Sequence, residues 1–176
     1  MKLVDIELVA DAVQHYYAGS YGGLDKLTPS VATGLIEASV HELAHAAVFG
    51  FKKPWTLRRC PNAVDDGSTI ADHVAKRFDA YADKHRSDVS ELRAVAVEIL
   101  VMAMLEIPLH TDKLIASAYR GLESGMTKRD AMRMVRKALR EKIAFRRART
   151  VVRWIGIAVK LYRTTAEWKK AYGGVA

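Results

Sequence analysis

Apolar residues recur every three or four positions along much of the chain, which is the pattern of amphipathic helices. Near the N-terminus this spacing covers residues 3–18 and ends in a glycine-rich segment at 19–23. A second helix is predicted to begin after Thr28, which can cap it, with Pro29 in its first turn and Gly50 just past its end. The first 50 residues are therefore expected to form two helices.

The apolar spacing resumes after a stretch that is rich in helix breakers. A short extended piece at 55–59 is weakly indicated, and it is the one hint of a strand. Further helices are predicted at about 68–85, at 87–107, where Pro108 would stop the helix, and at 111–122. These elements predict a mainly α protein with little or no sheet.

A long basic helical stretch follows. Thr127 begins a sequence that resembles a capping box, and the helical pattern runs to about Tyr162, with a break expected near Thr150 or Gly156. A chain of 176 residues is long enough for one sizeable core and too short for two ordinary domains. We therefore predict a single-domain multi-helix bundle.

Charge is unevenly distributed along this chain, whose net charge is +8. From Arg120 onward there are 16 basic and 4 acidic residues, whereas the first 119 residues carry an excess of acids. Basic helices of this kind form an ordinary solvated surface, bind nucleic acid or an acidic protein, or lie on an anionic membrane. Composition alone leaves all three interpretations open.

The longest apolar stretch, at 94–109, is interrupted by Glu98 and Glu106, and a bilayer span needs about 20 mostly apolar residues. No transmembrane helix is therefore expected. The N-terminus lacks the basic start and apolar block of a signal peptide. Cys60 is the single cysteine, so no internal disulfide can form. These features favour a cytoplasmic protein.

Residues 41–45 read His-Glu-Leu-Ala-His, an HExxH motif inside the second predicted helix. Residues four apart lie on one face of a helix, so His41 and His45 can direct their imidazoles at one Zn²⁺. Glu42 beside them can take a proton from a water molecule that the metal activates. The same spacing would also fit a solvated polar stripe. The motif nevertheless favours a zinc site with Glu42 as the catalytic residue.

A catalytic zinc site usually has a third protein ligand, and four downstream acids compete for this role. Glu91, Glu98 and Glu106 share one predicted helix, and Glu98 lies in so apolar a stretch that its carboxylate needs a partner. Asp112 lies in the first turn of the next helix, where the helix dipole would also favour an acid. The residues themselves leave the choice open.

The arrangement resembles the peptidase domain of the FtsH-type, membrane-associated AAA proteases, in a stand-alone form without the ATPase module. Residues 41–46 resemble the HEAGHA helix of that family, with Ala44 in place of its glycine, and residues 99–106 resemble the following apolar helix that ends in an acid. The family's aspartate at the start of the next helix corresponds to Asp112. The resemblance covers about residues 30–120 and implies that Asp112 completes the zinc site.

The expected function is thus that of a zinc-dependent metallopeptidase, in which His41, His45 and Asp112 bind Zn²⁺ and Glu42 is the general base. A zincin-like helical core would cover residues 1–125, with a basic helical region at 126–176 packed on the same domain. Its substrate would be a protein or peptide. Two alternatives stay open: a non-enzymatic basic module that binds nucleic acid or an acidic protein, and a zinc-binding scaffold without turnover.

Overall fold

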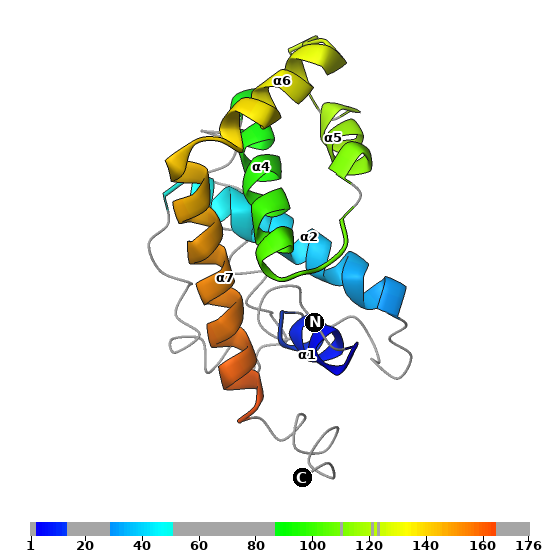
Figure 1. Cartoon of the computed structure of the whole chain (residues 1–176), viewed down its shortest axis with the longest axis vertical. Coiled ribbons are helices and arrows are strands. Elements are labelled where there is room, and N and C mark those ends of the chain that lie inside the picture. The colour runs from blue at the N-terminus through cyan, green and yellow to red at the C-terminus, as the bar shows by residue number, and fades with distance from the viewer. Residues whose placement is uncertain are drawn as a thin grey trace, which may run out of the picture.

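The computed structural model describes six helices and the short connections next to them, at residues 3–13, 29–50, 87–109, 111–120, 122 and 124–164. Their bounds are α1 Leu3–Val13, α2 Pro29–Val48, α4 Asp88–Met104, α5 Thr111–Arg120, α6 Lys128–Ala138 and α7 Lys142–Tyr162. No strand occurs among the described residues, which confirms the mainly α prediction (Figure 1). The expected helix at 68–85 and the extended piece at 55–59 lie outside them.

Two of the predicted helix ends are confirmed by their local geometry. Gly50 follows α2 with a φ of 84°, a left-handed conformation that glycine adopts without steric cost. At the start of α4, the Ser90 N–H donates to Ser87 Oγ at 3.3 Å and the Ser87 N–H donates to Ser90 Oγ at 3.0 Å. This reciprocal pair is a capping box built from two serines.

The end of α4 differs from the prediction, because the helix stops at Met104, before Pro108 can act. Glu106 adopts a left-handed φ of 57°, and this turn lets the Ile107 N–H donate to the Met102 carbonyl at 3.0 Å. Such a bond satisfies a carbonyl that the helix end would otherwise leave without a partner. Met102 and Ile107 are both buried, so the turn also closes an apolar contact.

The basic stretch is broken at 139–141, so the expected break near Thr150 or Gly156 is wrong. Both residues lie inside α7, where Thr150 Oγ1 donates to the Arg146 carbonyl one turn earlier. The position of the break follows from packing: α6 joins an apolar cluster with α4 and α5, whereas α7 joins a different one with α1, α2 and α4. The break lies between Ala138, which belongs to the first of these clusters, and Ala144, which belongs to the second.

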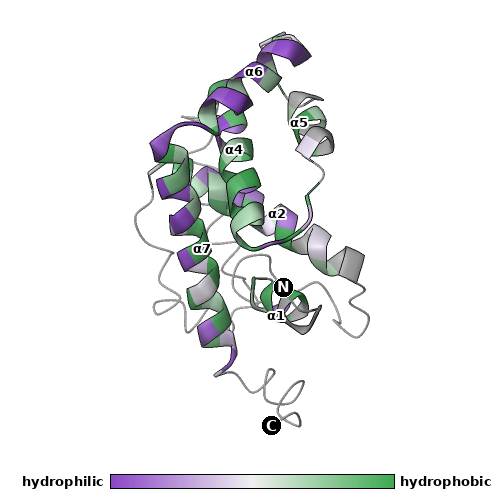
Figure 2. Ribbon diagram, viewed as in Figure 1, coloured by the Kyte–Doolittle hydropathy of each residue, from purple (hydrophilic) through white to green (hydrophobic). Residues whose placement is uncertain are grey.

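Helix α4 lies at the centre of the described bundle (Figure 1). One of its faces, with Ala94, Val97 and Val101, packs in the cluster that α2 and α7 share. The opposite face, with Leu92 and Val95, packs against α5 and α6. Figure 2 shows apolar residues gathered where these helices meet and hydrophilic ones on the outside. The described part of the basic region therefore packs on the same bundle as the HExxH helix.

None of the described helices is long and apolar enough to cross a membrane.

Candidate metal centre

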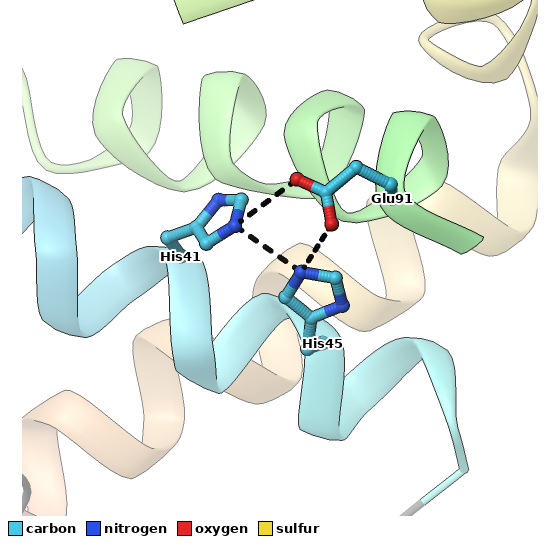
Figure 3. Close-up of side chains that lie close together, drawn as sticks. All are labelled: His41, His45 and Glu91. Carbon is cyan, nitrogen blue, oxygen red and sulfur yellow. Dashed lines mark hydrogen bonds and ion pairs between the residues drawn. The ribbon is translucent and has the colours of Figure 1, made fainter. Parts of the chain in front are cut away.

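Three side chains from two helices meet at one point: His41 and His45 from α2 and Glu91 from the first turn of α4 (Figure 3). The Nε2 atoms of the two histidines lie 3.1 Å apart. Glu91 Oε1 lies 3.3 Å from His41 Nε2, and Glu91 Oε2 lies 3.0 Å from His45 Nε2. Each residue thus directs one ligand atom toward a shared position.

The distances between these atoms fit a metal ion. Ligands that bind zinc tetrahedrally at about 2.0–2.1 Å lie about 3.3 Å from one another, which is close to the separations found here. Glu91 Oε2 is buried and, within the described part of the chain, accepts no hydrogen bond despite its proximity to His45. A cation between the three ligand atoms would neutralise this buried carboxylate in addition to its contact with His45.

Helix geometry and helix packing together build the cluster. Four residues of α-helix bring His41 and His45 to one face of α2, where the two rings meet edge to face with centroids 4.7 Å apart. Glu91 and Glu98 are seven residues apart, so both lie on one face of α4. Because α2 and α4 pack against each other, the two faces meet. Phe49 stacks on the His45 ring one turn further along.

Glu98 is a second carboxylate behind the cluster, on the other side of the His41 ring. Its side chain is 1% exposed, and its Oε2 lies 2.8 Å from His41 Nδ1. When His41 is neutral and Glu98 is ionised, Glu98 can accept the Nδ1–H, which leaves the Nε2 lone pair free to bind a metal. Histidine ligands of metals nearly always have such a partner. The sequence predicts that the Glu98 carboxylate needs a partner, and the structure gives it His41, one of the candidate metal ligands.

The two carboxylates control the ionisation of the site. Burial alone would lower the pKa of His41, but its hydrogen bonds to Glu91 and Glu98 outweigh burial and raise the pKa to about 10. Burial opposes ionisation of Glu91 too, yet its contacts with the two imidazoles hold the pKa of this carboxyl well below its usual range. For Glu98 burial prevails over the contact with His41, and the pKa is raised.

Exposure differs among the three candidate ligands. The His45 side chain is 4% exposed, whereas those of His41 and Glu91 are 24% and 15% exposed. The buried histidine lies toward the core and the other two lie nearer to solvent. His41 and Glu91 therefore keep partial contact with solvent, whereas His45 has almost none.

We expect Glu98→Ala to lower the affinity for zinc about 10- to 100-fold, the usual loss when the partner of a metal-bound histidine is removed. Glu98→Gln should lose less, because its amide oxygen can still accept the His41 Nδ1–H. Glu106→Ala is the matched control, since Glu106 is exposed beyond the other end of α4. Titration against a chromophoric chelator measures all three. Equal affinities for Glu98→Ala and Glu106→Ala would show that Glu98 does not orient the ligand.

The other residues expected in the site have different positions. Glu42 is exposed on α2, directly after His41. Glu106 is exposed, in the turn that ends α4. Asp112 is the second residue of α5, but its side chain is outside the described part of the structure, so its role as a ligand stays a prediction. Of the four acids considered, the structure brings Glu91 to both histidines.

The fold and the site together define an all-α protein with a candidate His–His–Glu metal centre. Comparison of the chain with protein-family models, with curated proteins and with solved structures gives no match.

Proposed function

We propose that this chain is a zinc-dependent hydrolase of the HExxH type that cleaves peptide bonds. The observation that carries the proposal is the convergence of His41 Nε2, His45 Nε2 and a Glu91 oxygen, with separations of 3.0–3.3 Å. Two histidines and one glutamate, with a fourth position left open, are a ligand set of catalytic zinc sites. The FtsH-type resemblance of the motif helix points to the same reaction.

In this proposal each residue has a separate task. His41, His45 and Glu91 hold the metal, and Glu98 orients the His41 ring through its Nδ1–H. A zinc ion held there would activate water and polarise the scissile carbonyl. Glu42, which follows His41 and is exposed, would be the general base that accepts a proton and returns it to the leaving amine. The peptide would approach past His41 and Glu91, which keep partial contact with solvent.

Elemental analysis of the protein purified without added metal tests the metal centre. About one zinc per chain is expected for the wild type and for His73→Ala, a histidine outside the motif, whereas His45→Ala should lose the metal while it keeps its helical circular dichroism spectrum. A folded wild-type protein that contains no metal and binds no added zinc would contradict the proposal.

A further inference from the structure

The helices α6 and α7 are rich in lysine and arginine, and none of these residues belongs to the candidate metal centre. Between residues 128 and 163 there are thirteen lysines and arginines and two acids, Asp130 and Glu141. Asp130 is already paired with Arg133, at 2.9 Å. Helix α7 itself contains no acid at all. The charge of α7 is therefore not neutralised by acids of its own helix.

Six of these basic residues form one line along α7. They follow one another at intervals of three, four or seven residues, which places them on the same face of the helix, and all six are exposed: Lys142, Arg146, Arg149, Arg153, Lys160 and Arg163. Neighbouring members are about 4.5 to 10 Å apart along the helix axis. Hydrophilic positions follow the outer side of α7 in Figure 2. A linear partner with regularly spaced negative charges would fit this line.

An aromatic side chain interrupts the basic line near its start. Phe145 is 47% exposed, three residues after Lys142 and four before Arg149, so it lies beside both on the helix surface. Exposed aromatic rings among cationic side chains can stack on the bases of a single strand whose phosphates the cations bind. Nearly half of this large apolar residue is thus open to solvent.

The burial of α7 argues against a membrane as the partner. A helix that lies in a bilayer interface inserts a continuous apolar face. In α7 that face is buried in the bundle, where Val151, Trp154 and Ile155 belong to the main apolar cluster. Ile143 and Phe145 are the large apolar side chains that α7 leaves exposed, and both are in its first turn. Two side chains are too few to anchor the helix.

We propose that the basic line of α7, together with Phe145, is a binding surface for a nucleic-acid strand whose phosphates lie along the helix. This function is separate from hydrolysis and does not depend on the metal centre. Arg147 also lies on α7, but it is half-buried and is not part of the basic line. Its Nη2 donates a hydrogen bond of 3.0 Å to the carbonyl of Val48, the last residue of the HExxH helix. The binding surface and the metal centre thus belong to helices in direct contact.

Fluorescence anisotropy with a labelled 20-nucleotide single strand, at 50 to 300 mM NaCl, tests this surface. The triple variant Arg146→Gln, Arg149→Gln, Arg153→Gln should bind at least tenfold more weakly than the control Lys26→Gln, Lys52→Gln, Lys53→Gln, which removes the same charge elsewhere. For the triple variant, the slope of log affinity against log salt concentration should be smaller by about 2 than for the wild type. Each neutralised phosphate contributes about 0.7 to this slope for a single strand, and the variant loses three positive charges.

Phe145→Ala gives a second, independent measurement. It should weaken binding of the single strand about fivefold or more without changing the salt slope, because it removes stacking and no charge. The residues changed on α7 are exposed, and circular dichroism verifies the folding of every variant. The proposal is overturned if the wild type does not bind at 50 mM NaCl, if the triple variant binds like its control, or if poly-glutamate or phosphatidylserine vesicles bind more tightly than the oligonucleotide.

Discussion

Replacement of Glu91 by glutamine is expected to lower the affinity of the chain for zinc about 100- to 1000-fold. A structural zinc site with four protein ligands binds with about 10–16 kcal/mol, so each ligand contributes about 2.5–4 kcal/mol. Glutamine keeps the size of the side chain but loses the charge, and the Glu91 carboxylate contacts both histidines. Competition with a chromophoric chelator at constant pH measures the change.

Asp112→Asn is the matched comparison, because it removes one carboxylate charge from the acid that the FtsH-type resemblance assigns to the zinc site. If Glu91 is the third ligand, Asp112→Asn should bind zinc nearly as tightly as the wild type. The reverse result, with a large loss for Asp112→Asn and none for Glu91→Gln, would reject Glu91 and support the assignment by resemblance. Thermal unfolding of both variants without metal checks that neither effect comes from misfolding.

Replacement of Glu42 by glutamine is expected to reduce peptide hydrolysis about 10²- to 10⁴-fold, the usual contribution of a general base. Zinc content should stay at the wild-type level, because Glu42 is exposed and is not among the groups that converge on the metal position. Hydrolysis of a fluorescence-quenched peptide library, together with elemental analysis of the same samples, measures both quantities.

Glu141→Gln is the control for this substitution, since Glu141 precedes α7 and its side chain makes no capping hydrogen bond. It should hydrolyse the library at the wild-type rate. Equal rates for Glu42→Gln and the wild type would remove Glu42 from the mechanism. A wild-type chain that holds zinc but hydrolyses no peptide would instead support the zinc-binding scaffold.

The charge balance of the site links metal binding to the protonation of His41. Two carboxylates, Glu91 and Glu98, flank His41, and a buried pair of this kind requires positive charge nearby. Without metal a proton on the His41 ring supplies that charge, which is why the pKa of His41 is raised to about 10. A zinc ion bound by His41 would take the place of this proton, because a metal-binding imidazole must be neutral.

Much of the helical structure is readable from local sequence signals. Ser87 and Gly50 mark helix ends through hydrogen bonds and backbone angles that involve only neighbouring residues. The break at 139–141 has no such local signal, because it depends on two apolar clusters assembled from distant helices. The early end of α4 likewise depends on Glu106 adopting a left-handed angle that is unusual for glutamate.

At the candidate metal centre, too, local sequence determines one part of the arrangement and the packing of distant helices determines the other. The sequence by itself determines that His41 and His45 share a face of α2, because the spacing of four residues matches the turn of an α-helix. It also places Glu91 and Glu98 on one face of α4. Which acid reaches the histidines is decided by how α2 and α4 pack, since the two helices are separated by about 40 residues of chain. Periodicity is a local property, whereas the contact between two faces exists only in the tertiary structure.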